Sequence, residues 1–191
     1  LPVLKPERAS AELAEQIREL NVEAAAVVAF GMLLTQPMLD AVPGGWVNLH
    51  FSLLPAWRGA APVQRSIMAG DQETGVTTFR LVKEMDAGPC YRQFSTPIGA
   101  AETAGQLLER LSHVGADLLL ATLDDIEAGV TPREQDPEDM SLAPKVTVDE
   151  VRIDWTQPAH RIDRLVRGAS PNPGAWTTLD EQRFKVLLVE S

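Results

Sequence analysis

The feature that most constrains the fold is an uninterrupted apolar run, AAAVVA, over Ala24–Ala29. A strand that covers a core on one face alternates apolar and polar residues, whereas a continuous apolar run predicts a strand with both faces buried. Such strands are typical of parallel sheets with helices on both sides. A second strand is expected at Trp46–His50, directly after the Gly44-Gly45 pair.

The segments around these strands predict an alternation of helices and strands. Apolar residues at helical spacing predict helices over residues 10–20, 35–42, 62–69 and 103–128. Two further segments, 76–83 and 91–98, predict strands that pair as a hairpin at an edge of the sheet. This order indicates an α/β fold with a doubly wound, mostly parallel sheet.

The composition changes after residue 130. Residues 131–147 hold three prolines and four acidic residues without periodicity, which predicts a linker. Beyond it, residues 151–155 are followed by a short helix at 159–167 and a strand-like segment at 184–189. A tail of this length is too short for an independent core, so we expect the beginning of a second domain.

Charge and cysteine usage exclude several classes of protein. The 191 residues carry a formal net charge of −10, which argues against a protein that coats nucleic acid by charge alone. The single cysteine, Cys90, excludes an intrachain disulfide framework and fits a reducing compartment. The longest apolar run, residues 24–34, is too short to span a bilayer. Three dispersed histidines and the lack of zinc-like spacing predict no metal site.

A polar pair stands at the end of the second predicted strand. Because side chains in a strand alternate, Asn48 and His50 project to the same face. In open α/β sheets ligands bind at the carboxyl ends of the strands, so an amide and an imidazole would converge on one crevice. The alternative is a polar strand end that is capped by hydrogen bonds from the loop.

Two charged residues flank this pair in the sequence. Arg58 lies in an unusually apolar loop, which favours a specific partner such as a phosphate or carboxylate, or else a salt bridge within the fold. Asp86 follows the next strand and would face the same crevice, where a carboxylate favours an imidazolium and fixes its tautomer. Locally, the sequence Asp-Ala-Gly is also that of an ordinary turn.

The acidity is unevenly distributed along the chain. Residues 1–145 hold 11 basic and 20 acidic side chains, whereas residues 146–191 hold 6 and 7. Three arginines of the tail, Arg161, Arg164 and Arg167, lie along one side of the predicted helix. They could contact a phosphate backbone or form a solvated helix face.

Taken together, these residues resemble a known family. The stretch NLHFSLLPAWRGAAPVQRSIMAGDQETGVTTFRLVKEMDAGP is similar to the catalytic core of the folate-dependent formyltransferases. The segments RIDW, at 152–155, and NPGAW, at 172–176, resemble the beginning of that family's C-terminal domain. The resemblance extends over essentially the whole chain.

The resemblance implies a Rossmann-like catalytic domain followed by an OB-like β-barrel. Residues 1–130 would form the catalytic domain without its N-terminal strands, 131–147 the linker, and 148–191 the beginning of the truncated barrel. Family members usually start with a strand, a glycine-rich turn and a basic loop upstream of Leu1. We therefore expect this chain to be the middle of a longer enzyme.

The resemblance also implies roles for individual residues. Asn48, His50 and Asp86 would be the catalytic trio, with the spacing of the family. Arg58 would lie on the side of the formyl acceptor, as would the arginines Arg161, Arg164 and Arg167. The folate pocket would be lined by three segments: Phe30, Gly31, Met32, Leu33 and Leu34; Ser52, Leu53, Leu54 and Pro55; and Val82, Lys83, Glu84 and Met85.

The implied activity is transfer of a formyl group from 10-formyltetrahydrofolate to the α-amino group of charged initiator tRNA, methionyl-tRNA, for translation initiation. Such an enzyme would be a cytoplasmic, monomeric one-carbon transferase without a metal or a membrane partner. Relatives act on glycinamide ribonucleotide, a nucleotide-linked amino sugar or water. The run AAPVQ and the segment RIDW favour the tRNA acceptor. A different class would be a fragment that binds folate or RNA without catalysis.

Overall fold

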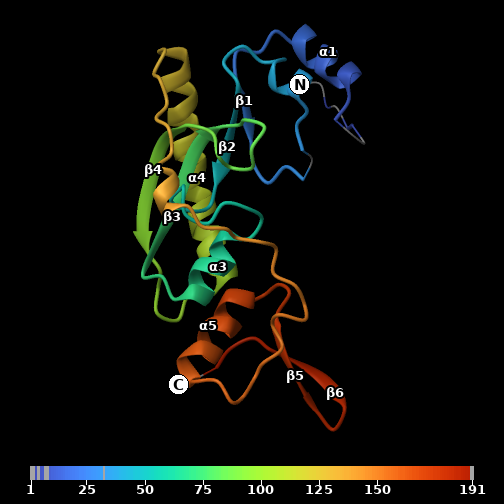
Figure 1. Cartoon of the computed structure of the whole chain (residues 1–191), viewed down its shortest axis with the longest axis vertical. Helices are drawn as coiled ribbons and strands as arrows, with labels where there is room; N and C mark the ends of the chain where they lie inside the picture. Colours follow the sequence, from blue (N-terminus) through green and yellow to red (C-terminus); the bar gives the residue numbers. More distant parts are fainter. Residues whose placement is uncertain (1–2, 4, 7–8, 32, 190–191) are drawn as a thin grey trace.

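The computed structural model describes residues 3, 5–6, 9–31 and 33–189. The chain forms two groups of elements, joined by a long crossing segment (Figure 1). The first group comprises α1 (Ala11–Glu19), β1 (Ala25–Val27), α2 (Gln36–Leu39), β2 (Trp46–His50), α3 (Pro62–Ala69), β3 (Glu73–Arg80), β4 (Cys90–Pro97) and α4 (Ala104–Glu127). After a 3-10 turn at Pro137–Asp139, the second group comprises α5 (Ala159–Ala169), β5 (Ala175–Leu179) and β6 (Gln182–Val186).

The main sheet confirms the α/β class but is mixed in its described part. Its strand order is β1-β2-β3-β4. The pair β1–β2 is parallel, whereas β2–β3 and β3–β4 are antiparallel, the latter as the predicted hairpin. The expectation of a mostly parallel sheet therefore does not describe these four strands. Helix α3 connects β2 to β3 and packs against α4 and α5 at one end of the sheet. Because β2 ends and β3 begins at this same end, the two strands run antiparallel.

The run AAAVVA forms a strand that is shorter and less buried than its sequence predicts. Of the six residues, only three belong to β1, and of these only Val27 is buried while Ala26 is exposed. The reason is its position: β1 is an edge strand of the described sheet and pairs only with β2. The prediction of a fully buried strand is wrong for this reason, although the parallel pairing that it indicated is present.

The predicted helices form close to their expected limits except α2, which spans Gln36–Leu39 and is half as long as the predicted segment 35–42. The side chain of Ser10 caps α1 by accepting a hydrogen bond from the backbone N–H of Leu13. Thr103 and Gln106 form a capping box at the start of α4. Gly70 ends α3 in the left-handed region, at φ +88°, where glycine has no Cβ to clash. The strand β3 begins three residues before the predicted segment 76–83.

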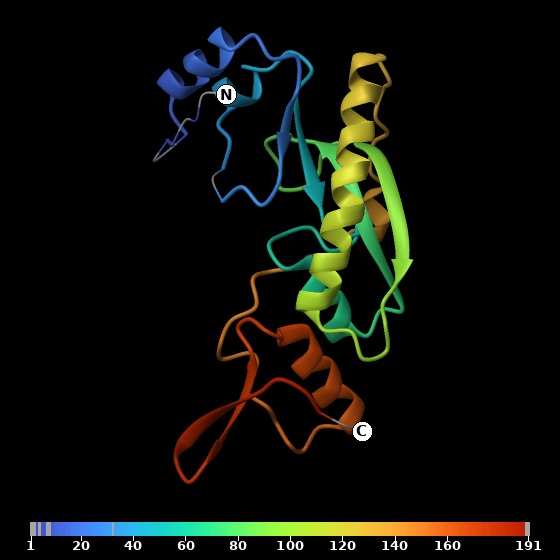
Figure 2. The same ribbon diagram turned by 180° about the vertical axis from the view of Figure 1, so that it is seen from behind.

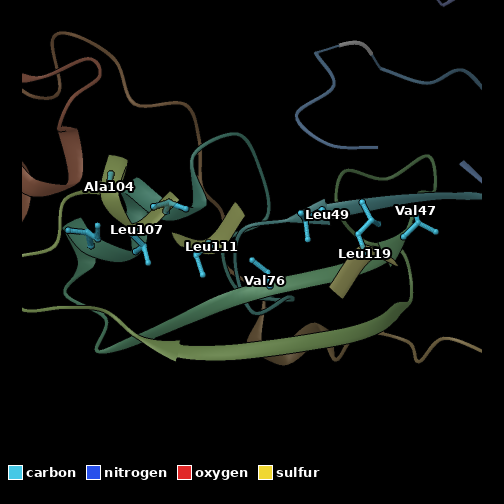
Figure 3. Packing of buried hydrophobic residues seen from close by; sticks show 9 residues of the cluster. Val47, Leu49, Val76, Ala104, Leu107, Leu111 and Leu119 are labelled. Atoms are coloured by element: carbon cyan, nitrogen blue, oxygen red, sulfur yellow. The ribbon is translucent and has the colours of Figure 1, made fainter. Parts of the chain in front are cut away.

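The core of the first group lies between α4 and the sheet (Figure 3). Gly115 lets α4 approach β2 closely, since a Cβ there would lie 2.6 Å from Cδ2 of Leu49. Leu49 is the residue between Asn48 and His50, so this packing fixes the strand that carries both. The labelled residues of this core are Val47, Leu49, Val76, Ala104, Leu107, Leu111 and Leu119.

The second group packs beneath the first, around a small core that also includes Ala61, the residue before α3 (Figure 2). Helix α5 lies against α3, and the hairpin β5–β6 extends beyond it. Residues 151–155 make an isolated bridge to the hairpin, between Arg152 and Trp176. The strand predicted at 184–189 begins earlier, at Gln182. The domain limits at 130 and 147 stay a prediction.

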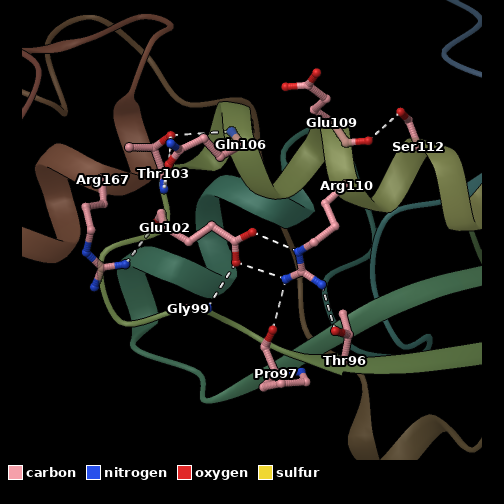
Figure 4. A network of polar contacts seen from close by, with 10 residues as sticks. All are labelled: Thr96, Pro97, Gly99, Glu102, Thr103, Gln106, Glu109, Arg110, Ser112 and Arg167. Carbon is pink, nitrogen blue, oxygen red and sulfur yellow. Dashed lines mark hydrogen bonds and ion pairs between the residues drawn. The ribbon is translucent and has the colours of Figure 1, made fainter.

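A network of arginine contacts ties the start of α4 to the sheet and to α5 (Figure 4). Arg110 Nε donates to Glu102 Oε1 at 2.9 Å, and its Nη1 donates to Thr96 Oγ1 at 2.7 Å. Arg167 Nη1 donates to the carbonyl of Glu102 at 3.1 Å. The two groups of elements are thus joined by specific polar contacts. Among the described residues, no helix has both the length and the apolar character needed to cross a bilayer.

Candidate active site

A cavity of about 520 Å³ opens at the carboxyl ends of β1 and β2, where ligands bind in open α/β sheets. Asn48, His50 and Asp86 all line it, so the structure brings the three predicted catalytic residues together. The rest of the wall is mainly apolar, and its size is typical of a site for a small organic molecule. The alternative, a polar strand end that is capped by hydrogen bonds from the loop, also has a counterpart here, because Nε2 of His50 faces the carbonyl of Trp57 in that loop.

His50 is held at its Nε2 by a backbone carbonyl. Only 5% of the residue is exposed, and Nε2 lies 2.8 Å from the carbonyl oxygen of Trp57. A carbonyl can only accept, so Nε2 carries the proton and Nδ1 has a free lone pair when the ring is neutral. The ring of Phe79 packs edge-on against the imidazole, with the centroids 6.3 Å apart. The tautomer is therefore fixed by the loop after β2.

The environment of His50 favours its neutral form. Burial lowers the pKa of the imidazole below its ordinary value of 6.5, and this outweighs the opposing effects of the Asp86 carboxylate and the Trp57 carbonyl. Nδ1 of His50 lies 3.7 Å from Oδ2 of Asp86. A neutral imidazole beside a carboxylate can accept a proton at Nδ1, and the carboxylate then stabilises the imidazolium. This arrangement suits a general base.

Asp86 sits on the turn between β3 and β4 in a constrained backbone conformation. Its φ of +48° lies in the left-handed region, which is unusual for a residue other than glycine. Oδ2 accepts a hydrogen bond from the backbone N–H of Gly59 at 2.8 Å. The carboxylate therefore connects the β3–β4 turn to the loop after β2, beside the histidine. Strained backbone of this kind clusters at functional sites.

Asn48 supplies a further polar group of the cavity. It precedes His50 by two residues on β2, and both side chains line the cavity. Within the described part of the chain, no hydrogen bond engages the side-chain amide of Asn48. Its N–H groups are therefore available as donors to an oxygen that develops negative charge in the cavity.

Two of the three predicted folate segments contribute to the cavity wall. The first segment contributes from the loop after β1, although Gly31 is not among the lining residues and Met32 lies outside the described residues. The third segment contributes from the β3–β4 loop. The wall residues from these segments are Phe30, Leu33, Leu34, Val82, Lys83, Glu84 and Met85.

The middle segment, Ser52, Leu53, Leu54 and Pro55, does not line the cavity. Ser52 is fully buried, and its hydroxyl donates to the carbonyl of Ala56 at 2.6 Å. The backbone N–H of Leu54 donates to Thr77 Oγ1 at 3.1 Å. These contacts build the loop that carries Trp57, since the polar groups are satisfied within the fold. Direct contact of this segment with folate stays a prediction.

The guanidinium of Arg58 binds a side-chain amide of the same chain. The sequence had favoured an anion, such as a phosphate or carboxylate, as its partner. Its Nε and Nη2 donate to Oε1 of Gln135, at 3.0 and 2.6 Å. Gln135 lies in the segment predicted to be a linker, 77 residues further along the chain. No motif or periodicity marks it, so sequence reasoning missed this contact. A role of Arg58 towards the acceptor stays a prediction.

The three arginines of α5 differ in their surroundings. Arg161 is exposed. Arg164 packs against Gly70, where a Cβ would lie 2.2 Å from its guanidinium carbon. Arg167 is half-buried, and its Nε donates to Asp163 at 2.9 Å while Nη1 reaches Glu102. Two of the three therefore contribute to contacts between α5 and the first group. Their binding to an acceptor stays a prediction.

Several wall residues carry no chemical signature in the sequence. They come from the loop after β2, from the first turn of α3 and from α4, and the fold alone brings them to the cavity. The apolar character of the loop was the only signal that pointed to part of this group. These residues are Gly59, Ala60, Pro62, Val63, Gln64 and Leu108.

Comparison with known structures places the fold among formyltransferases. Methionyl-tRNA formyltransferase from Clostridium thermocellum matches with a TM-score of 0.74 and 16% identity, covering 96% of this chain and 77% of that one. HypX from Aquifex aeolicus, in complex with tetrahydrofolic acid, matches with a TM-score of 0.78 and 19% identity, covering 92% of this chain and 31% of that one. At such identities the similarity establishes the fold.

Sequence comparison is more specific. A relative from Mycolicibacterium vanbaalenii, named methionyl-tRNA formyltransferase, is 54% identical over 188 residues, which are 97% of this chain and 61% of the relative. The chain thus spans less than two thirds of the length of that relative. Residues 4–123 match the formyl transferase family, and residues 145–191 match the formyl transferase C-terminal domain. The chain belongs to the formyl transferase family.

Proposed function

We propose that this chain is the catalytic part of an enzyme that transfers a formyl group from 10-formyltetrahydrofolate to the α-amino group of methionyl-tRNA. The observation that carries the proposal is the convergence of Asn48, His50 and Asp86 on one cavity. The choice of acceptor is supported by the name of the relative that is 54% identical. The cytoplasm, where aminoacylated tRNA is used, is the expected location.

The cavity suits a folate on chemical grounds. A flat, fused ring requires apolar walls, which Phe30, Leu34 and Val82 supply, and polar groups at one end for orientation. Asn48 and His50 supply polar groups of this kind. The HypX structure, which has the same fold, holds tetrahydrofolic acid. Both observations support a folate as the formyl donor.

His50 would act on the attacking amine. The amine must lose a proton as its nitrogen bonds to the formyl carbon, and Nδ1 of His50 is positioned as the acceptor of that proton. Asp86, 3.7 Å away, stabilises the resulting imidazolium. When the bond from the formyl carbon to the donor nitrogen breaks, the same imidazolium returns the proton to that nitrogen. The proton balance closes without a further acid.

Asn48 would stabilise the oxygen of the formyl group. This oxygen becomes negatively charged when the amine adds, and the amide N–H of Asn48 can donate to it. A fixed donor of this kind contributes about 3–4 kcal/mol to the transition state. The formyl carbon is already electrophilic. These residues therefore contribute to catalysis mainly by positioning the reactants and by hydrogen bonding.

The test is a formyl-transfer assay on this chain and on a longer version with the segments that its relatives carry beyond it. Charged tRNA and a nucleotide-linked amino sugar are supplied separately with 10-formyltetrahydrofolate, and the formylated product is measured by mass spectrometry. Formylation of methionyl-tRNA supports the proposal. Formylation of the amino sugar alone would reassign the acceptor, and folate binding without any product would indicate a binding fragment.

A further inference from the structure

One segment of the chain, residues 133–143, holds the loop that fixes His50. The backbone N–H of Trp57 donates to Ser141 Oγ at 2.9 Å. The backbone N–H of Arg58 donates to the Ser141 carbonyl at 2.9 Å, and Ala143 N–H donates to the Arg58 carbonyl at 2.7 Å. Trp57 has a φ of +62°, so this side of the loop has an unusual backbone conformation. Its carbonyl is the one that accepts from His50.

Gln135, in the same segment, connects this loop to the turn of Asp86. Its Nε2 donates to the carbonyls of Asp86 and Gly88, at 2.9 and 2.7 Å. Its Oε1 accepts from Nε and Nη2 of Arg58. A side-chain amide has two donor hydrogens and two acceptor lone pairs, so Gln135 uses its full capacity. Such complete satisfaction fixes the orientation of the amide plane and of both partners.

Besides the hydrogen bond from Gly59 N–H to the Asp86 carboxylate, few contacts define the turn of Asp86. Its internal backbone hydrogen bond, from Ala87 N–H to the Glu84 carbonyl, is long at 3.4 Å. Asp86 itself has a left-handed backbone, which persists only where the surroundings impose it. Gly88 approaches the chain closely, since a Cβ there would lie 1.8 Å from the Arg80 carbonyl oxygen. Gln135 thus binds two carbonyls of this turn, those of Asp86 and Gly88.

We propose that Gln135 is a positioning residue for formyl transfer: by binding the Asp86 turn and Arg58 together, it sets the distance between the Asp86 carboxylate and His50. The proposal rests on the function proposed above. It also assigns a role to residues 133–143, between the two groups of elements. These residues complete the surroundings of His50. A shift of about 1 Å in a catalytic group can reduce turnover about 100-fold.

Two substitutions distinguish the hydrogen bonds that Gln135 donates from those that it accepts. Gln135→Met keeps the size of the side chain and removes all four hydrogen bonds, whereas Gln135→Glu keeps an acceptor for Arg58 but cannot donate to the two carbonyls. We expect both variants to reduce kcat about 10- to 100-fold. Gln157→Met, at an exposed glutamine that donates to Asp154, is the matched control and should leave kcat unchanged. An effect of Gln135→Glu no larger than that of the control would overturn the proposal.

A double-mutant cycle tests whether Gln135 acts through Asp86. In the Asp86→Asn background, Gln135→Met should cause little further loss of kcat, because the carboxylate that it positions is absent. A full additional loss would mean that Gln135 acts elsewhere and would overturn the proposal. Thermal unfolding midpoints of all variants, measured in parallel, identify any loss of activity that merely reflects unfolding.

A second measurement is independent of activity and therefore decides the inference even if the proposed reaction is wrong. The titration midpoint of the His50 imidazole is followed by NMR, with the other two histidines as internal references. Besides Asp86, the charged side chains that line the cavity are Lys83 and Glu84. Asp86→Asn should lower the midpoint in the native chain, and much less so in the Gln135→Met background. Equal shifts in both backgrounds would show that Gln135 does not set the distance.

Discussion

The substitution Asp86→Asn tests the electrostatic role of the carboxylate with little change in shape. The asparagine retains an oxygen that can accept from Gly59 N–H, so the turn should persist. What disappears is the negative charge 3.7 Å from Nδ1 of His50. Burial favours the neutral form of His50 in the resting site, and the ring becomes charged when it takes up the proton of the amine. Removing the carboxylate therefore destabilises the transition state more than the resting state.

The size of the effect follows from this distance. Two unit charges 3.7 Å apart attract each other by about 1 kcal/mol in water and by about 4.5 kcal/mol at an effective dielectric constant of 20. The side chains are only 6% and 13% exposed, which favours the larger value. We therefore expect kcat to fall about 5- to 2,000-fold, with the result nearer the larger value.

The assay is single-turnover formyl transfer at pH 7, with the thermal unfolding midpoint as a measure of folding. The matched control is Asp125→Asn, which removes the same charge from a carboxylate that pairs with Arg92 outside the cavity. Turnover of Asp86→Asn within about threefold of the native value, in a folded protein, would refute the assigned role of the carboxylate.

Further predictions concern the oxyanion donor, the core and the response to acid. Asn48→Ala should lower kcat about 100-fold or more in the formyl-transfer assay, without a change in the unfolding midpoint. In urea unfolding, Leu111→Ala, at a fully buried position, should cost about 2–5 kcal/mol, whereas Leu120→Ala on the same helix, at 63% exposure, should change stability by no more than about 0.5 kcal/mol. Glu150 has its pKa lowered from 4.5 to about 2 by hydrogen bonds from Arg65 and Thr147, so its contribution is full above pH 4.5 and is lost as the pH falls towards 2. Because the side chain is 44% exposed, this contribution is about 1 kcal/mol, and Glu150→Gln should remove it in acid-unfolding measurements. Burial lowers the pKa of His50 in the folded chain, so the unfolded chain binds the proton first, and stability should decrease as the pH falls below 6.5, with a smaller slope in His50→Gln.

Local patterns in the sequence were sufficient for several elements. The limits of α3 and β2 follow from Pro62, Gly70 and the Gly44-Gly45 pair, because these residues restrict the backbone directly. The run AAAVVA shows where such reasoning ends. Its apolar character predicted burial on both faces, but burial depends on the neighbours of a strand, and β1 lies at an edge of the described sheet.

By itself the sequence determined the α/β class and the polar pair at the end of β2, because strand alternation is a local property that places Asn48 and His50 on one face. The position of Asp86 after the next strand also indicated the same crevice, but its local sequence is that of an ordinary turn, and a resemblance in sequence was needed to favour the functional interpretation. The tertiary structure alone decided the tautomer of His50, through the Trp57 carbonyl, and the contacts of Gln135. These depend on hydrogen bonds between segments far apart in the chain, and no local pattern encodes such geometry.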